Sequence, residues 1–372
     1  MATEQTYDQR PMRIMISGGG TGGHIYPAIS IAQALESLLS DVEILFVGAQ
    51  GKMEMKKVPE AGYKIVGLWI SGLQRKLTPS NLLFPFKVLS SIFKSFGLLK
   101  SFQPDAVIGV GGYASAPLLY AAAKKKIPTL IQEQNSYAGL TNKWLSKKVD
   151  KICVAYEGLE KYFPAEKIVL TGNPVRSAIA AADRKSSATF FDLDPEKKTI
   201  LVVGGSLGAR TINDSLLHHF KEVQAAGVQL LWQTGGFYFQ QVMDRLKGEN
   251  LEGIKVMDFI TEMKHAYGAA DIVVSRAGAL AIAELMLTAK ATVLVPSPNV
   301  AEDHQTLNAK ALVEKDAAVM VTDKEANDKL IERALHLVND EAQLRTLETN
   351  IAALAKPNAA NDIANEVMKL IA

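Results

Sequence analysis

Near its start the chain reads Arg13-Ile-Met-Ile-Ser-Gly-Gly-Gly-Thr-Gly-Gly-His24, a short apolar segment that passes directly into a glycine-rich turn. Pro27 then stands at the first turn of a predicted helix. Glycines let the backbone approach a ligand closely, and the amide groups at a helix start favour anions. The order of strand, glycine turn and helix returns at Thr199-Ile-Leu-Val-Val-Gly-Gly-Ser-Leu-Gly-Ala-Arg210. This repeat predicts two α/β units, each with an anion-binding turn.

Strand-like and helix-like segments alternate outward from these two turns. Continuous apolar strands separated by helices are typical of parallel sheets that are covered on both faces. We therefore expect an α/β protein with two Rossmann-like domains, whose parallel sheets face each other across a cleft and bind ligands at the carboxyl ends of their strands. The expected strands are 13–17, 43–47, 106–110, 129–132, 151–154, 199–203, 229–232, 271–274, 291–295 and 318–321.

The boundary between the two domains is expected just after residue 176. The segment 177–198 is rich in Ala, Ser, Asp and Lys and has no strand pattern before Thr199 begins a new sheet. We therefore expect an N-terminal domain at 1–176 and a C-terminal domain at 177–357, with a final helix at 358–372 that packs back onto the first domain.

The composition excludes several classes of protein. The 372 residues include 41 basic and 39 acidic side chains, for a net charge of +2, whereas a nucleic-acid-binding domain is strongly basic. The single cysteine, Cys153, allows no intramolecular disulfide and reads as a core residue in a reducing compartment. Neither a signal peptide nor a spanning helix is expected, so any membrane contact would be peripheral.

Four polar residues stand shortly after strands of the predicted sheets. His24 follows the first glycine turn and could accept a proton from a hydroxyl group, or could simply bond to backbone at a helix start. Glu133 and Asn135 follow the strand 129–132, where the alternative is a capped turn into the next helix. Glu284 lies near the start of a helix and suits two ribose hydroxyls, although an acid there can also interact with the helix dipole.

Two other chemistries are disfavoured. The first turn matches G-x-G-x-x-G at Gly18, Gly20 and Gly23, but Phe46-Val-Gly-Ala-Gln50 lacks the acid that holds the ribose of a dinucleotide. The sequence also contains no zinc-type His/Cys cluster and no P-loop, and its only Asp-x-Asp, at Asp192, lies in the linker-like segment. We therefore expect no metal and no cofactor, and a leaving diphosphate would be stabilised by helix N-termini with Arg176 or Ser206.

Taken together, the motifs resemble the MurG family, the peptidoglycan N-acetylglucosaminyltransferases of the glycosyltransferase-B fold. The resemblance extends from about 14 to about 308 and rests on motifs in the family's order: Gly19-Gly-Thr-Gly-Gly-His24, Gly111-Gly-Tyr113, Glu133-Gln-Asn135, Gly172-Asn-Pro-Val-Arg176, Gly204-Gly-Ser206 with Gly208-Ala-Arg210, and Gly278-Ala-Leu280 with Glu284.

The resemblance implies transfer of N-acetylglucosamine from UDP-N-acetylglucosamine to the muramyl 4-hydroxyl of lipid I, with inversion, to give lipid II for the cell wall. It places the acceptor on the N-terminal domain and the UDP-sugar on the C-terminal domain. Its partners would be these two substrates, an anionic membrane surface and other cell-wall synthesis proteins. The enzyme would act peripherally, at the cytoplasmic face of the bacterial inner membrane.

Residue by residue, the resemblance gives His24 and Glu133 catalytic roles. Ser206 would bind the donor diphosphate, the backbone of Ile260 the uracil, Glu284 the ribose and Gln305 the sugar. The full set of implied substrate-binding residues is Thr21, Gly22, Gly23, Tyr113, Asn135, Arg176, Ser206, Ile260, Ala279, Leu280, Ala281, Ile282, Ala283, Glu284 and Gln305.

Two positions depart from the family pattern. Ala281 stands where the family often has a hydroxyl residue, and His304 where it often has a second glutamine. The alternatives left open are another glycolipid synthase of the same fold, for example one that uses UDP-galactose on diacylglycerol, a UDP-N-acetylglucosamine epimerase, and a non-enzymatic sensor of nucleotide sugars.

A stretch from 61 to 104 contains no Asp or Glu but several Lys and Arg residues among aromatic ones. A basic, aromatic and amphipathic segment suits an anionic membrane surface, although a core helix with lysines that extend to water has the same pattern. The residues expected to contact the membrane are Leu82, Leu83, Phe84, Phe86 and Phe93.

Overall fold

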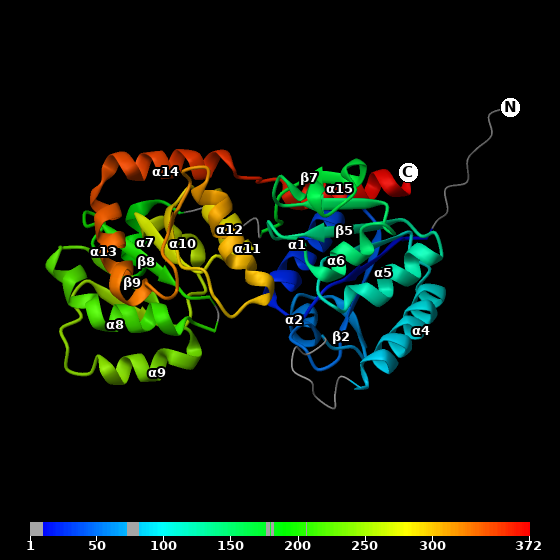
Figure 1. Cartoon of the computed structure of the whole chain (residues 1–372), viewed down its shortest axis with the longest axis horizontal. Coiled ribbons are helices and arrows are strands. Elements are labelled where there is room, and N and C mark those ends of the chain that lie inside the picture. Colours follow the sequence, from blue (N-terminus) through cyan, green and yellow to red (C-terminus); the bar gives the residue numbers. More distant parts are fainter. Residues whose placement is uncertain (1–9, 73–81, 176–178, 180–181, 206) are drawn as a thin grey trace. The chain divides into compact units, whose positions relative to one another are not determined.

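The computed structural model describes residues 10–72, 82–175, 179, 182–205 and 207–372. It divides into two compact units, one formed by Met1–Pro174 with Asn358–Ala372 and the other by Val175–Pro357. Figure 1 shows that each unit consists of a sheet with helices packed around it. Both sheets are parallel throughout their described strands, which confirms the predicted α/β class.

The first unit contains a seven-stranded sheet in the order β3-β2-β1-β4-β5-β6-β7. Its strands are β1 (Met12–Ser17), β2 (Val42–Ala49), β3 (Lys64–Leu68), β4 (Ala106–Gly109), β5 (Thr129–Glu133), β6 (Lys151–Val154) and β7 (Ile168–Leu170). Its helices are α1 (Gly22–Leu38), α2 (Glu54–Glu60), α4 (Phe84–Phe102), α5 (Ser115–Lys124), α6 (Leu140–Leu145) and α15 (Ala359–Ile371).

Alternate residues of β1 serve two hydrophobic cores in this unit. Ile14 and Ile16 are buried on the face covered by α1 and α15, whereas Met15 is buried on the face covered by α4 and α5. This period of two is what a strand covered on both sides requires. The C-terminal helix α15, red in Figure 1, packs against α1 although it follows the second unit in the sequence.

The second unit contains a six-stranded sheet in the order β10-β9-β8-β11-β12-β13. Its strands are β8 (Thr199–Val203), β9 (Gln229–Gln233), β10 (Ile254–Met257), β11 (Ile272–Ser275), β12 (Ala291–Leu294) and β13 (Val319–Met320). Its helices are α7 (Arg184–Phe190), α8 (Arg210–Ala225), α9 (Gly236–Arg245), α10 (Met263–Ala269), α11 (Ala279–Leu287), α12 (His304–Val313), α13 (Ala326–Asn339) and α14 (Glu341–Ala353).

Both sheets reverse their strand order beside the first strand, between β1 and β4 and between β8 and β11. In open parallel sheets such a reversal leaves a crevice at the carboxyl ends of the strands, where ligands bind. Both predicted glycine turns follow the strands that flank this point, after β1 and after β8. The topology therefore directs the search for a site to these turns.

The sequence missed three outer strands and one helix start. β3, β7 and β10 are short and lie toward the sheet edges, where burial is incomplete and the apolar pattern is weak. The first helix begins at Gly22, so Pro27 lies in its second turn and not its first. The prediction placed the start too late because glycine is a poor helix former in isolation.

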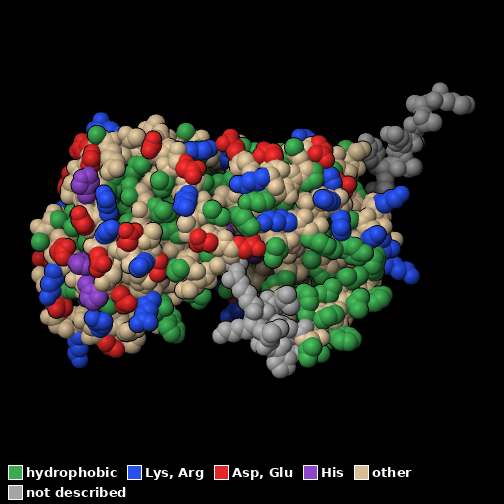
Figure 2. Space-filling model, in the orientation of Figure 1, with side chains coloured by type: hydrophobic (Ala, Val, Ile, Leu, Met, Phe, Trp, Pro, Cys, Tyr) green, Lys and Arg blue, Asp and Glu red, His purple; other side chains and the backbone are tan. Residues whose placement is uncertain are grey.

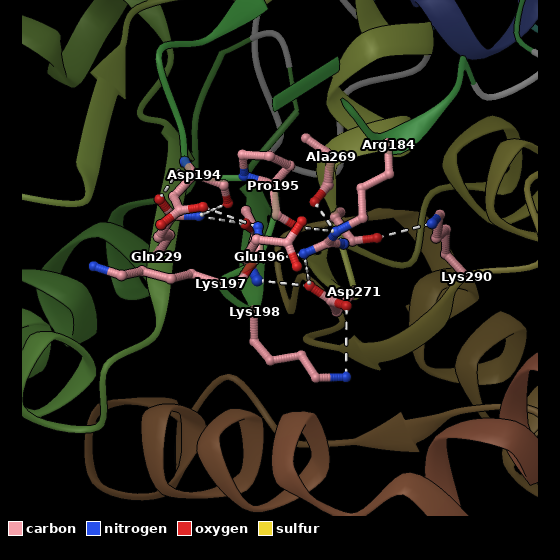
Figure 3. Close-up of polar contacts among 12 residues, drawn as sticks. Arg184, Asp194, Pro195, Glu196, Lys197, Lys198, Gln229, Ala269, Asp271 and Lys290 are labelled. Atoms are coloured by element: carbon pink, nitrogen blue, oxygen red, sulfur yellow. Dashed lines mark hydrogen bonds and ion pairs between the residues drawn. The ribbon is translucent and has the colours of Figure 1, made fainter. Parts of the chain in front are cut away.

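The amino ends of the strands in the second unit are held by Asp271. Its Oδ2 accepts a hydrogen bond from the Thr199 amide at 2.7 Å and forms an ion pair with Arg184 at 3.0 Å. Figure 3 shows Arg184 and Lys198 converging on this carboxylate. The Arg184 side chain also donates to the carbonyl of Pro195, so it ties the segment before β8 to the sheet.

Candidate active site

A pocket of about 500 Å³ opens at the carboxyl ends of β8 and β11 in the second unit. This size is ordinary for a small-molecule site. Its walls are formed by the turn after β8, the turn after β11 and the loop after β12. The lining residues are Val203, Gly204, Gly205, Gly208, Ala209, Arg210, Thr211, Tyr238, Ser275, Arg276, Gly278, Ala281, Ser297, Asn299, Gln305 and Asp323.

Two helix N-termini reach this pocket. Arg210 begins α8, and Gly278 is the N-cap of α11. The first amides of each helix have no acceptor within the helix and carry the positive end of its dipole. Gly208 allows the close packing of the turn after β8, since a Cβ atom there would lie 2.1 Å from the Thr234 carbonyl oxygen. The pocket is therefore suited to a diphosphate.

Arg276 is a pocket residue that sequence reasoning did not assign, although the strand β11 leads straight to it. Its guanidinium forms an ion pair with Asp323 at 2.5 Å and donates to the carbonyls of Val295 and Pro296. Asp323 also accepts a hydrogen bond from the Thr211 hydroxyl at 3.0 Å. These contacts fix the Arg276 guanidinium, with its partner carboxylate, beside the helix N-termini. Only the fold brings Asp323 to Arg276, so their pairing had no signal in the sequence.

Glu284 lies on α11 and is oriented by a tyrosine from α10. Its Oε2 accepts a hydrogen bond from the Tyr267 hydroxyl at 2.9 Å. Burial raises the pKa of Tyr267 well above its ordinary value, and the charge of Glu284 adds to the shift, so this hydroxyl stays a donor. Ala281 lines the pocket one turn before Glu284, whereas the neighbouring Ile282 is buried in the core.

The predicted uracil and sugar contacts are already involved in internal hydrogen bonds. The Ile260 amide donates to Gln233 Oε1 at 2.9 Å, so only its carbonyl could pair with the N–H of a base. Gln305 lines the pocket and accepts a hydrogen bond from the Ser297 amide at 2.8 Å through Oε1. Its amide nitrogen is the atom suited to a sugar hydroxyl.

In the first unit, the glycine turn places His24 against the turn after β4. His24 Nδ1 lies 3.2 Å from the Thr21 hydroxyl oxygen. A Cβ atom on Gly111 would lie 3.0 Å from His24 Nε2, so the glycine leaves just enough room for the imidazole ring. Tyr113, from the same turn, stands beside Gly20, and burial raises the pKa of its phenol. The structure thus brings together three of the predicted residues, Thr21, His24 and Tyr113.

Glu133 is buried, with 2% of its surface exposed. Its carboxylate accepts hydrogen bonds from the amides of Asn135 and Gly139 and from the side chains of Asn135 and Asn142. Burial raises the pKa of Glu133, and these four hydrogen bonds oppose the shift. These donors come from the loop after β5 and from the start of α6, a geometry that favours the capped turn over direct contact with a substrate.

Arg176 and Ser206 lie outside the described residues. Gly22 and Gly23 form the first turn of α1, and Ala279 and Leu280 the first turn of α11. Ala283 is buried beside Ile282. No group of three or more potential metal ligands from His, Cys, Asp and Glu occurs among the described residues.

Helix α4 presents apolar side chains to solvent. Figure 2 shows hydrophobic side chains gathered over this helix. Exposure reaches 77% for Leu82, 64% for Phe86 and 74% for Phe93, whereas Phe84 is partly buried. We call the exposed residues Leu82, Leu83, Phe86, Leu89 and Phe93 the α4 patch. Within the part of the chain that the structure describes, no helix is both long enough and apolar enough to span a bilayer.

Two Rossmann-like units, one with a pocket edged by helix N-termini, are the architecture of the glycosyltransferase-B fold class. Residues 14–154 match the glycosyltransferase family 28 N-terminal domain, and residues 199–367 match the C-terminal domain of that family. The chain belongs to glycosyltransferase family 28, and within it to the MurG family, the UDP-N-acetylglucosamine–N-acetylmuramyl-(pentapeptide) pyrophosphoryl-undecaprenol N-acetylglucosamine transferases.

Three relatives support this assignment. The transferase of that name from Cytophaga hutchinsonii is 57% identical over 98% of both chains. The one from Parabacteroides distasonis is 55% identical over 97% of this chain and 99% of its own. Among solved structures, Acinetobacter baumannii MurG superposes with a TM-score of 0.78 at 28% identity, covering 96% of this chain and all of its own.

Proposed function

We propose that this enzyme transfers N-acetylglucosamine from UDP-N-acetylglucosamine to the muramyl 4-hydroxyl of lipid I and so forms lipid II. The observation that carries the proposal is the pocket of the second unit, which two helix N-termini and Arg276 line. Such a pocket suits the diphosphate of a nucleotide sugar, and the relatives' names specify which sugar and which acceptor.

The donor is held by the second unit. Its diphosphate lies at the N-termini of α8 and α11, and the negative charge that develops on the leaving UDP is stabilised by these amides and by Arg276. Glu284, held by Tyr267, accepts hydrogen bonds from the ribose hydroxyls. The Ile260 carbonyl accepts the uracil N–H, and Gln305 donates to the sugar.

The acceptor is held by the first unit, and His24 is the general base. In one displacement the acceptor oxygen forms a bond to the anomeric carbon as the bond to UDP breaks, which inverts that centre. The proton of the acceptor hydroxyl passes to His24 Nε2. This nitrogen is unprotonated in the neutral ring only if Nδ1 carries the hydrogen and donates it to Thr21.

The α4 patch docks the enzyme on the anionic surface in which the lipid-linked acceptor is anchored. Its Phe and Leu side chains would enter the interface between headgroups and acyl chains. Two lysines of α4 point back into the unit, because Lys87 donates to Ser71 Oγ and Lys94 to the Gly67 carbonyl. The attraction to headgroups must then come from other basic residues, such as Lys148, which lies over the exposed Trp144 of α6. On this proposal the enzyme works at the cytoplasmic face of the inner membrane.

The deciding experiment supplies a soluble lipid I analogue and radiolabelled UDP-N-acetylglucosamine, without added metal. We expect label in the glycolipid and release of UDP only when acceptor is present. Transfer from UDP-galactose to diacylglycerol would instead identify another glycolipid synthase. Conversion of the donor sugar in the absence of acceptor would identify an epimerase.

A further inference from the structure

Glu54 is a buried carboxylate beside the first glycine turn that none of the steps above uses. It lies on α2, and none of its surface is exposed. Its Oε2 accepts a hydrogen bond from the Gly20 amide at 2.9 Å, and its Oε1 accepts one from the Ala49 amide at 3.0 Å. The carboxylate thus joins the glycine turn after β1 to the end of β2.

The backbone leaves a slot of the right size for this side chain. A Cβ atom on Gly19 would lie 2.1 Å from Glu54 Oε1, and the three atoms nearest to it all belong to Glu54. A Cβ atom on Gly48 would lie 2.5 Å from Glu54 Cγ. Two glycines, one in the turn after β1 and one in strand β2, are therefore needed for one carboxylate to fit.

The glycine turn is held from its other side by the turn after β4. A Cβ atom on Gly112 would lie 2.5 Å from the Gly19 carbonyl oxygen, and the ring of Tyr113 lies next to Gly20. Gly20 itself has a φ of +89°, which a residue with a side chain would rarely adopt. Glu54 and Tyr113 thus both lie beside Gly20, Glu54 at its amide and Tyr113 next to its Cα atom.

Among the described residues, Glu54 takes part in no ion pair. A buried carboxylate without a cation is costly unless hydrogen bonds and a helix dipole compensate its charge. The two amides and the nearby N-terminus of α1 supply that compensation. The carboxylate in turn occupies the Gly20 amide, which is then withdrawn from any anionic ligand.

We propose that Glu54 is the positioning residue of the acceptor site. By holding the Gly20 amide, it fixes the glycine turn so that the first amides of α1, at Gly22 and Gly23, are the ones left for the pyrophosphate of the lipid-linked acceptor. The turn also sets the place of Thr21 and His24. This inference rests on the proposed acceptor role of the first unit.

The test compares Glu54→Gln with Glu60→Gln, an exposed change on the same helix. Gln presents an N–H₂ group to one of the two amides, so one contact is lost and the turn must shift. We expect Glu54→Gln to lower kcat/KM for the soluble acceptor by roughly 10- to 100-fold, the loss of one hydrogen bond to a charged group. The affinity for UDP, measured by calorimetry, should stay unchanged because the donor pocket lies in the other unit. Glu60→Gln should match the wild type.

A double variant separates positioning from packing. Gly19→Ala alone should lower the melting temperature, because its methyl group would overlap the Glu54 carboxylate. Combined with Glu54→Ala, the methyl group no longer meets a carboxylate, so the double variant should lose less melting temperature than the two single changes added together, while acceptor turnover stays low. Full acceptor kcat/KM in Glu54→Gln, an equal loss of UDP affinity, or recovery of turnover in the double variant would overturn the proposal. Absence of transfer by the wild-type enzyme would instead refute the proposed function.

Discussion

The two ring nitrogens of His24 are not equivalent, and the difference decides whether this residue can act as a base. Nδ1 lies 3.2 Å from the Thr21 hydroxyl oxygen, and Nε2 lies beside Gly111. If Thr21 accepts the hydrogen of Nδ1, then Nε2 is the ring nitrogen that takes up the proton of the acceptor. Thr21 would then act through His24 and not on the substrate.

Thr21→Val tests this role. Valine has nearly the shape of threonine but accepts no hydrogen bond, so the ring of His24 would no longer be held in the base-competent tautomer. We expect kcat to fall roughly 10-fold, the loss of about one hydrogen bond, and His24→Ala to lower it further. Thr21→Ser, which keeps the hydroxyl, is the matched control. Equal activity of Thr21→Val and Thr21→Ser in the acceptor assay would argue against the tautomer model.

Glu133 differs from His24, because its carboxylate at the end of β5 accepts hydrogen bonds from the following loop and the start of α6. Because burial raises its pKa, the folded state binds this proton more tightly than the unfolded chain does. The stability that Glu133 contributes is therefore present below the ordinary Glu pKa of 4.5 and is lost as pH rises through the raised value.

The direction of this pH dependence can be measured by urea unfolding of the wild type and Glu133→Gln across a pH series. The unfolding free energy of the wild type, relative to the variant, should decrease as pH rises above 4.5. The slope should not exceed about 1.4 kcal/mol per pH unit. An increase with pH would mean that the four hydrogen bonds outweigh burial and that the pKa is lowered.

At the scale of single elements, α4 differs most from the other helices. The sequence predicted a basic, aromatic and amphipathic segment within 61–104, and the structure has a helix there at Phe84–Phe102 with part of its apolar side exposed. A helix that leaves large apolar side chains in solvent has a binding surface, not only a core-facing side. Membrane docking remains a prediction for this surface. Because Phe84 is partly buried, the residues expected to contact the membrane are those of the α4 patch.

Replacement of Phe86 and Phe93 by serine should weaken binding to anionic liposomes but leave turnover on a soluble acceptor unchanged. Both side chains are exposed, so the fold loses little when they are shortened. Sedimentation with vesicles that contain acidic lipid measures the binding. The control is the same change at Phe190, an exposed aromatic residue of α7 in the other unit. Parallel loss of binding and soluble turnover would show that these residues support the fold.

At the scale of the whole molecule, the chain crosses between its two units twice. α15 follows the second unit in sequence but is part of the first, where Ile363 and Val367 are fully buried. The first unit is therefore incomplete until the last residues of the chain are present.

Truncation after residue 357 should test this dependence. Loss of Ile363 and Val367 from the core should destabilise the first unit by about 3 kcal/mol or more. The melting temperature of the first unit should therefore decrease, and the rate of acceptor turnover should decrease as well. UDP should still stabilise the second unit by mass action, which differential scanning calorimetry detects. The control is removal of Ala372 alone. A lower melting temperature of the second unit, with the first unit unchanged, would contradict the assignment of α15 to the first unit.

The sequence by itself determined the α/β class, the two glycine turns and the motifs that led to the family, because apolar periodicity and glycine spacing are local properties. It also marked His24 and Glu284, since both stand near the start of a helix that follows a recognisable strand and turn. Only the tertiary structure decided how these groups are held: that Tyr267 orients Glu284, that Asp323 pairs with Arg276, and that Glu54 occupies the Gly20 amide. The physical reason is distance along the chain, because hydrogen bonds and steric slots form between segments that only the folded topology brings together.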